Sequence, residues 1–429
     1  MPKALSVKTT RATRRLLYCA IGAALLSIPT LAVADETFSL QTAVTIPGHP
    51  LSSFDISWVD SSLHSYLLAD RTNASIDIID TGAGHTVRQI TPSGSNAFAG
   101  DTGNSDTSGP NGVLTVSQPG NPDNQNSHGA VQIWAGDGPH GTDCATNAAD
   151  CSSVKILSFD TGAVVNVVNT GGQARADELC FDPRDHLVMI ANDADNPPFV
   201  TFISTEGNNK ILGKIQIPES NGGVEQCQWN PRNGMIYLNI PSTVDDSNGK
   251  VYVIDPRHET IVHKYDAGNG CQPAGMAIGP APNILLGCGP NAANVAEVMD
   301  ENTGAVTTIA GQSGSDEVWF NPGDGHYFLA ESNNPVQRQL GIVDSGDLSV
   351  DQDIKTGPSS HSVAADPNAN TAYVPIKCSG GTSGTPTACV AAGVNTTCGS
   401  GGGSNTQGCV AIYGPVGTDD SPNVNRDTN

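Results

Sequence analysis

The sequence predicts an all-β fold, a seven-bladed β-propeller in which an N-terminal strand completes the last blade. The first observation behind this prediction is a repeated phrase: a short apolar strand, a tight turn and a second apolar strand. The prolines that end the first strand of each phrase lie 48, 49, 42 and 45 residues apart: Pro183, Pro231, Pro280, Pro322 and Pro367. A period of about 45 residues is typical of propeller blades.

Two further observations support this fold class. Most repeats continue with two more strand-like runs, such as Ile76–Asp80 or Val251–Asp255, and then Ala163–Val168 or Ile211–Ile217. Four short strands per repeat make one blade, which cannot bury both of its faces unless it packs between two others. The composition agrees, because 48 Gly, 28 Pro and only 15% charged residues favour strands joined by many turns.

The first 34 residues are predicted to be a secretory signal peptide and not part of the fold. Five basic residues precede the apolar run Leu16–Leu31, and Ala32–Ala34 provides a small-residue cleavage site. The apolar run is too short for a stable membrane span. Thr13–Leu17 also resembles a twin-arginine signal. The protein is therefore expected in the bacterial periplasm or medium, exported by the Sec or the twin-arginine route.

Closure of the ring is predicted from the two ends of residues 35–415, the expected propeller domain. Phe38–Ile46 looks like the outermost strand of a blade that lacks its first three strands. The last repeat ends early, after Cys409–Tyr413. Pairing of these two segments would remove two exposed strand edges. The polar segment 416–429 is expected to be a disordered tail.

The blades follow one another along the chain. Blade one is predicted over Ser52–Thr91 with the inner strand Phe54–Trp58, and blade two has the inner strand Asn111–Val116 followed by Ala130–Trp134. Polar, Gly-rich segments interrupt blade two and make it the least regular. The remaining five blades are expected to begin near Ala176, Gly222, Cys271, Gly314 and Ser360.

Ten cysteines remain after removal of the signal peptide, an even number that implies disulfides in an exported chain. Cys144 and Cys151 enclose one short loop, and Cys271 and Cys288 lie at neighbouring strand ends. Both pairs are predicted to be disulfides. A metal–thiolate site is the less favoured alternative, because the compartment is oxidising.

The sequence leaves the pairing of the other six cysteines open. Cys180 and Cys227 occupy nearly equivalent places on the inner strands of adjacent blades. The last four lie in a Gly-, Ser- and Thr-rich insertion, where one bond would staple the base of a long hairpin and the other would lie inside it: Cys378–Cys409 and Cys389–Cys398.

The charge of the chain restricts its partners. The predicted mature protein has 15 Lys and Arg against 43 Asp and Glu. Such an acidic surface repels phosphate backbones, so nucleic acid is not an expected partner. We expect a monomer whose partner is a small-molecule ligand or another protein.

The repeats resemble those of the YVTN-type seven-bladed propellers over essentially the whole mature chain. The resemblance rests on the small-Gly-Val-Ala-Val-x-Pro phrase, the apolar run after it and the Ile-Asp-x-x-Thr-Gly phrase. It implies the propeller fold and leaves the activity open, because propellers have many functions.

A local resemblance links one position to the gluconolactonase-like (senescence-marker) propellers. Their inner strands open with Glu-Gly-Pro, Pro-Asn-Gly or Pro-Asp-Gly, and the acidic or amide side chain binds a divalent metal in the channel. Pro110-Asn111-Gly112 fits this phrase, whereas Pro273-Ala274-Gly275 lacks the ligand. No Gly follows Asp177-Glu178 or Asp316-Glu317, so these blades depart from the pattern.

The candidate site is the set of residues at the entrance of each inner strand. These entrance positions should lie at one level near the channel axis: Asp55, Asn111, Asp177, Glu225, Ala274, Asp316 and His361. Polar residues follow several of them: Glu178, Gln226, Glu317 and Ser362. No Lys or Arg occupies an entrance position. The alternative interpretation is a solvated channel lining without function.

Carboxylate oxygens and a histidine at one level suit a divalent cation. The predicted cofactor is Ca²⁺, Mg²⁺, Mn²⁺ or Zn²⁺, with these ligands: Asn111, Asp177, Glu225, Asp316 and His361. The expected function is a metal-dependent, lactonase-like hydrolase or lyase, with His361, Glu225 and Asp177 as catalytic residues. The alternative is a non-catalytic propeller scaffold that binds a protein or glycan.

Overall fold

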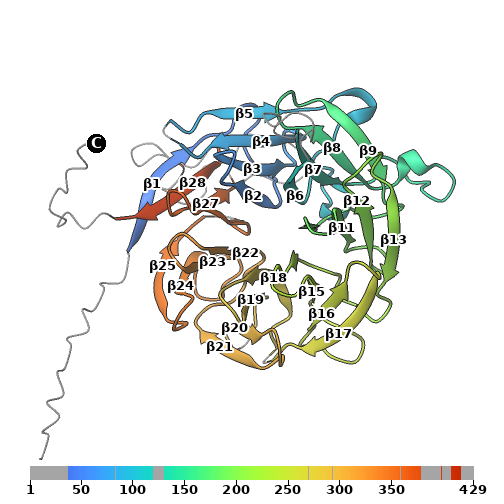
Figure 1. Cartoon of the computed structure of the whole chain (residues 1–429). Coiled ribbons are helices and arrows are strands. Elements are labelled where there is room, and N and C mark those ends of the chain that lie inside the picture. Colours follow the sequence, from blue (N-terminus) through green and yellow to red (C-terminus); the bar gives the residue numbers. More distant parts are fainter. Residues whose placement is uncertain are drawn as a thin grey trace, which may run out of the picture. The chain divides into compact units, whose positions relative to one another are not determined.

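The computed structural model describes residues 37–82, 84–118, 130–268, 270–291, 293–357, 359–377, 398 and 407–416. These residues form seven four-stranded antiparallel sheets arranged in a ring (Figure 1). The prediction of a seven-bladed all-β propeller is confirmed. The predicted signal peptide lies outside the described residues, as does the tail beyond residue 416. None of the described helices is long and apolar enough to span a membrane.

The first three blades begin at the channel and end at the rim, and their strands pair in chain order. Blade one contains β2 (Ser57–Asp60), β3 (Ser65–Asp70), β4 (Ser75–Asp80) and β5 (Val87–Ile90). Blade two contains β6 (Val113–Ser117), β7 (Val131–Asp137), β8 (Ser153–Ser158) and β9 (Val164–Asn169). Blade three contains β10 (Leu179–Asp182), β11 (Leu187–Asn192), β12 (Phe199–Ser204) and β13 (Ile211–Gln216).

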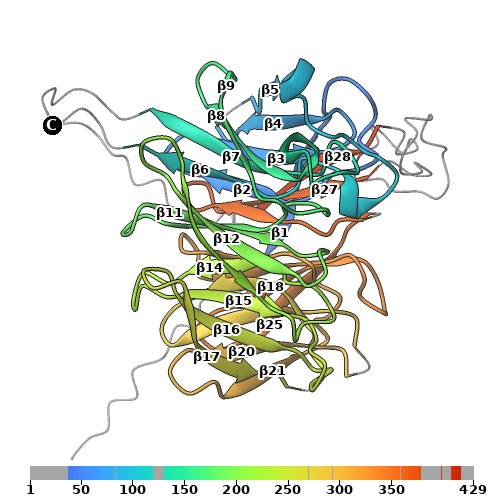
Figure 2. The same ribbon diagram turned by 90° about the vertical axis from the view of Figure 1, so that its right-hand side faces the viewer.

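Blades four to six repeat this order, and the 90° view shows their sheets stacked below those of blades two and three (Figure 2). Blade four contains β14 (Cys227–Trp229), β15 (Ile236–Ile240), β16 (Lys250–Asp255) and β17 (Thr260–Asp266). Blade five contains β18 (Pro273–Ile278), β19 (Asn283–Cys288), β20 (Val295–Asp300) and β21 (Val306–Ala310). Blade six contains β22 (Val318–Asn321), β23 (His326–Glu331), β24 (Gln339–Asp344) and β25 (Val350–Lys355).

Blade seven contains strands from both ends of the chain. β26 (Ala364–Asp366), β27 (Thr371–Ile376) and β28 (Cys409–Pro415) are completed by β1 (Phe38–Val44), so the sheet order is β26-β27-β28-β1. β1 runs antiparallel to β28 from the Phe38–Pro415 pair to the Val44–Val410 pair, and the two strands lie side by side in Figure 1. The predicted closure by the N-terminal strand is confirmed.

The burial of each strand follows its place in the blade. Every residue of β3, β11 and β23 is buried, because a neighbouring blade covers each face of these middle strands. Strands buried on both faces need continuous apolar runs. The outermost strands β13 and β17 are largely exposed at the rim. The cores therefore lie between blades, as where Met189 and Phe202 of blade three pack with Tyr252 of blade four.

The inner strands of blades one and two begin later than predicted. β2 begins at Ser57 and not at Phe54, and β6 begins at Val113 and not at Asn111. The residues just before these strands still hydrogen-bond to the second strand of their own blade, since Asp55 N donates to Ala69 O. In blade two, Gly112 N donates to Asp177 O of blade three, which interrupts the regular pairing within the blade.

The structure places four disulfides within the described residues. The predicted Cys144–Cys151 and Cys271–Cys288 bonds are confirmed, and a third bond, Cys180–Cys227, joins β10 to β14 across two blades. The fourth corrects the prediction for the insertion. Cys409 bonds Cys398, whose Cα is 5.5 Å away, and not Cys378. This bond closes a short loop, which costs little chain entropy. Cys378 and Cys389 lie outside the described residues.

Candidate functional site

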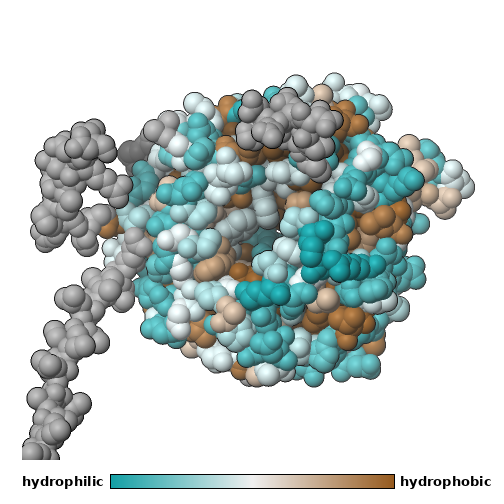
Figure 3. Space-filling model, in the orientation of Figure 1, coloured by the Kyte–Doolittle hydropathy of each residue, from teal (hydrophilic) through white to brown (hydrophobic). Residues whose placement is uncertain are grey.

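Four of the entrance positions line one cavity where the inner strands begin. Asp55, Glu225, Asp316 and His361 come from blades one, four, six and seven. The cavity, which we call the polar pocket, has a volume of about 420 Å³ and has further polar and basic lining: Arg71, Ser105, Arg175, Ser332, Asn333, Arg338, Ser359 and Lys377. The space-filling view shows the ring face hollowed near its centre (Figure 3).

The other three entrance positions do not line the pocket. Two of them join neighbouring blades: the Asn111 side chain donates from Nδ2 to the carbonyl of Ala176 at 2.9 Å, and the Ala274 carbonyl accepts a bond from Asn239 Nδ2 at 2.8 Å. The third, Asp177, accepts a hydrogen bond from Arg175 of its own blade. These three residues therefore support the wall of the pocket.

Backbone hydrogen bonds hold neighbouring entrance segments together. Three of them cross from one blade to the next: Gly112 N to Asp177 O at 3.1 Å, Gln226 N to Ala274 O at 3.2 Å, and Glu317 N to His361 O at 2.9 Å. The first requires a glycine, because a Cβ at position 112 would lie 2.1 Å from the Asp177 carbonyl oxygen. The common level of the entrance positions is thus maintained by direct contacts between blades.

Arg71 is the first charged group that the entrance pattern does not include. It follows β3 and its Nη2 lies 2.5 Å from Asp55 Oδ2, while its Nε donates to Asn111 Oδ1 at 2.9 Å. Burial alone would raise the pKa of Asp55, but the Arg71 guanidinium and the nearby His361 outweigh burial and lower it. Asp55 is therefore an ionised carboxylate with a fixed counter-charge.

Arg175 is the second such group. Its Nε donates to Asp177 Oδ2 at 2.6 Å, and its Nη2 donates to Asp193 Oδ2 at 2.9 Å. The Arg175 side chain is 15% exposed, and both carboxylates are less exposed than the arginine. Arg175 thus neutralises two buried acids and presents its positive charge to the polar pocket.

The entrance positions contain no Lys or Arg, as the sequence shows, but that observation did not reveal the two arginines of the site. Both arginines reach the site from other positions: Arg71 follows a second strand, and Arg175 lies two residues before Asp177. The signal for Arg175 was present, because residues two apart on an extended chain point to the same side. Nothing local in the sequence indicates the reach of Arg71 to blade two.

His361 has a fixed ring orientation. Its Nδ1 lies 2.9 Å from the carbonyl of Ser359, so Nδ1 carries the proton that this acceptor needs. Nε2 lies 3.5 Å from Asp55 Oδ1. The ring stacks on Phe54 with a centroid separation of 4.8 Å. The imidazole is thus oriented with Nε2 beside the pocket carboxylates.

Glu225 and Asp316 differ from Asp55, the third acid of the pocket, because neither of their side chains makes a hydrogen bond or ion pair with a described residue. Burial, followed by the charge of Asp316, raises the pKa of Glu225 well above its usual value. Burial also raises the pKa of Asp316, although His361 opposes that rise. The pocket therefore offers two acids that hold protons more strongly than ordinary carboxyl groups.

A second layer of polar groups lies below the polar pocket, one residue further along the inner strands. Glu178 of blade three hydrogen-bonds Glu317 of blade six, and Glu317 also contacts Gln226. The two glutamates come from non-adjacent blades, so they meet inside the channel. Burial raises the pKa of Glu178, and it raises that of Glu317 to about 8. Ser362 does not join this pair but bonds Ser57 Oγ at 2.8 Å.

Comparison with solved structures identifies the architecture. One similar chain belongs to the crystal structure of a mitotic checkpoint complex, with 13% identity, a TM-score of 0.55 and coverage of 85% of this chain and 96% of the other. Another is the Neurospora crassa Pan2 WD40 domain, with 10% identity, a TM-score of 0.54 and coverage of 89% and 96%. The second of these is a WD40 domain, and at such identities the likeness supports the propeller fold alone.

The comparisons identify the fold and no family. No protein-family model and no curated protein matches the propeller chain. The resemblance to YVTN-type propellers and that to gluconolactonase-like propellers therefore stay predictions. Because a propeller fold has many functions, the function must be argued from the polar pocket and its neighbours.

Donor atoms close enough to share a metal ion occur in two places among the described residues, each with three donors within 4.8 Å of one another. One set contains Cys271 and Cys288, whose sulfurs form a disulfide, and the other surrounds His326 in blade six. Neither set includes an entrance position, and Asp55 is paired with Arg71. A metal at the entrance positions stays a prediction.

The raised pKa of Glu317 predicts a pH effect on folding. A carboxyl whose pKa rises from 4.5 to about 8 on folding favours the folded state below pH 4.5 and loses this contribution as pH rises to about 8. Each unit of pKa shift corresponds to about 1.4 kcal/mol. We expect Glu317→Gln to flatten the fall of unfolding free energy between pH 5 and 8.5, measured by urea denaturation. Equal pH profiles in both proteins would contradict this assignment.

Proposed function

We propose that the protein is an exported propeller that binds a small polar molecule in the polar pocket and acts on it as a hydrolase or lyase. The observation that carries this proposal is the pair Glu225 and Asp316. Both face the cavity, both have a raised pKa, and neither has a protein partner among the described residues. Acids with shifted pKa values in a concave site are typical of acid–base catalysis.

The charges around the pocket support a ligand with an anionic group. Arg71, Arg175, Arg338 and Lys377 line it, in a chain with only 20 Lys and Arg against 43 acids. Arginine guanidinium groups recognise carboxylates well. The ligand class that fits is a small carboxylate-bearing molecule with hydroxyl or carbonyl groups, which Glu225 and His361 can reach.

The two acids suit different roles because their surroundings differ. Glu225 has the pKa raised well above its usual value, so it is the proton donor to a leaving oxygen. His361 opposes the rise for Asp316, so Asp316 is the base that accepts a proton from water or from a carbon next to the carboxylate. Asp177, an expected catalytic residue, is assigned a positioning role because it holds Arg175.

The second candidate role of Glu225 and Asp316 is to bind a divalent cation. The observation that favours it is the mutual repulsion of Glu225 and Asp316, which a bound cation would relieve. His361 is the imidazole among the described residues that line the pocket. Such a site would supply Lewis-acid chemistry, as the predicted lactonase-like activity requires.

The test is a panel of lactones, esters and hydroxy acids with the purified mature protein. We expect turnover of at least one panel member and a loss of about a hundredfold or more in kcat/KM for Glu225→Gln and Asp316→Asn. Glu206→Gln, in an exposed turn, is the matched control and should keep full activity. Elemental analysis and a chelator arm separate the two candidates, because only the metal-dependent reaction stops on chelation.

The scaffold alternative has its own outcome in this experiment. A folded protein that turns over no panel member and binds none of the carboxylates would overturn the enzyme proposal. That result would favour a propeller that binds a protein or glycan on its loop face.

A further inference from the structure

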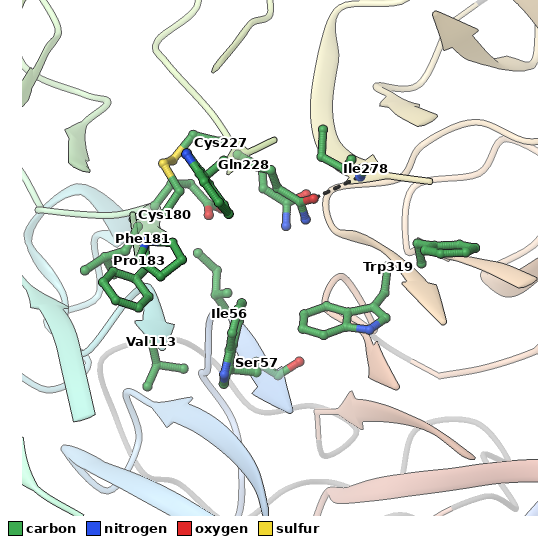
Figure 4. Close-up of a pocket in the computed structure, with 16 residues that line it drawn as sticks. Ile56, Ser57, Val113, Cys180, Phe181, Pro183, Cys227, Gln228, Ile278 and Trp319 are labelled. Carbon is green, nitrogen blue, oxygen red and sulfur yellow. Dashed lines mark hydrogen bonds between the residues drawn. A yellow bond between two sulfur atoms is a disulfide. The ribbon is translucent and has the colours of Figure 1, made fainter. Parts of the chain in front are cut away.

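A second cavity lies at the other end of the channel, and we call it the aromatic cavity. It has a volume of about 330 Å³. Five partly exposed aromatic side chains line it: Trp58, Phe181, Trp229, Trp319 and Phe320. Three of the four tryptophans of the chain are thus gathered in one cavity. Figure 4 shows Phe181 and the Cys180–Cys227 disulfide across an open space from Trp319.

The direction of the inner strands separates this cavity from the polar pocket. In blade four, Glu225 lines the polar pocket and Trp229 lines the aromatic cavity. In blade six, Asp316 lines the pocket and Trp319 the cavity. The layer that contains Glu178 lies between the two. The aromatic cavity is therefore distinct from the site of the proposed reaction.

The wall of the cavity is apolar and acidic, without a basic residue. Glu178 and Gln226 are lining residues, and Glu178 is hydrogen-bonded to Glu317. Neither Lys nor Arg occurs among the described residues that line the cavity. Trp58 and Trp319 pack edge to face, with centroids 5.3 Å apart. The cavity therefore combines aromatic rings with a carboxyl pair that lacks a counter-charge.

We propose that the aromatic cavity binds an organic cation of the quaternary or alkylated ammonium class. Indole and phenyl faces attract such cations and tolerate their apolar substituents. An anionic ligand would meet Glu178 without any basic partner. A small metal ion would exchange much of its water shell for aromatic rings, which offer no oxygen ligands. The net charge of -23 also draws cations toward the chain.

The carboxyl pair also favours a positively charged ligand. The largest charge effects on Glu178 and Glu317 come from acidic groups of the surrounding blades: Asp55, Asp177, Glu225 and Asp316. An organic cation in the cavity is therefore attracted both by the aromatic rings and by the acidic layer beneath them.

The test compares choline with 3,3-dimethylbutan-1-ol, which has nearly the same shape and no charge. Tryptophan fluorescence and calorimetry report binding to the full mature protein. We expect choline to bind about ten- to thirtyfold more tightly than the neutral alcohol.

Variants identify the site within the protein. Trp319→Leu and Glu178→Gln should each weaken choline binding, because both side chains line the cavity. Glu331→Gln is the matched control, since Glu331 is also a buried glutamate but accepts hydrogen bonds from Asn334 and Gln339 outside the cavity. If Trp319→Leu does not fold, as judged by circular dichroism, Trp229→Leu replaces it.

Two outcomes would overturn the proposal. Equal affinity for choline and the neutral alcohol would show that charge is not recognised. No binding of choline by the folded protein, up to high millimolar concentration at pH 9, would remove the site. Either result leaves the proposed reaction in the polar pocket untouched, because its assay uses other residues and other ligands.

Discussion

A chain that begins at Leu51 is expected to lose the cooperatively folded ring. Without β1 the seven residues of β28 become an exposed strand edge. The truncation also removes Phe38, whose side chain is 3% exposed and packs edge-on against Phe328 and His326. Both of these residues would then lose a packing partner. Removing a buried Phe side chain alone costs about 3–5 kcal/mol, a large part of the stability of a typical domain.

The measurement is thermal and urea denaturation, with a chain that begins at Asp35 as the control. The control keeps β1 and should unfold in one transition, as the full mature chain does. Phe38→Ala tests the side chain apart from the strand and should give an intermediate loss, because the Phe38 backbone keeps its two bonds to Gln352. Equal stability of the two truncated chains would contradict closure by β1.

Arg175→Ala is expected to destabilise the propeller more than other single substitutions of its basic residues. It leaves Asp177 and Asp193 buried without their partner. Removing one member of a buried ion pair costs about 3–5 kcal/mol. Arg257→Ala is the control, since Arg257 pairs with Asp185 while 55% exposed and should cost less than about 1 kcal/mol.

The pH dependence of this variant separates lost charge from lost packing. Burial raises the pKa of Asp177 and Asp193, and Arg175 opposes that rise. Without Arg175 the pKa of both acids therefore rises further, so protonation at low pH relieves the unpaired charge. The destabilisation should therefore be smaller at pH 4 than at pH 8. Arg175→Ala combined with Asp177→Asn should recover part of the loss. If Arg175→Ala loses the same unfolding free energy at both pH values, lost packing and not lost charge explains the destabilisation.

Several features of the fold could be predicted because they depend on local patterns. Continuous apolar runs such as Leu187–Ala191 indicate strands that are covered on both faces, and the recurring Pro turn sets the period of the blades. Closure by Phe38–Val44 could be inferred since the last repeat lacks a strand. The Cys271–Cys288 bond was predictable because the two residues end neighbouring strands.

The candidate site was predicted only in part. Register along the chain identified Asp55, Glu225, Asp316 and His361, which the ring brings to one cavity. The spacing within the repeats does not reveal which long side chains reach that cavity from other strands. For this reason Arg71, which follows the second strand of blade one, was missed. Nothing in the sequence indicates that Asn111 would bind Arg71. The contact between Asp177 and Arg175 could have been inferred from their spacing, but the sequence analysis did not use that signal.

By itself the sequence determined the strands, the number of blades and the level at which the entrance residues lie, because each of these is set by spacing within one repeat. Only the tertiary structure decided which side chains meet across the channel. Glu178 and Glu317 are 139 positions apart, yet they share a hydrogen bond, and Trp58 meets Trp319 at the far end. Such contacts depend on the radius of the closed ring and the reach of each side chain, and neither quantity is encoded in a single repeat.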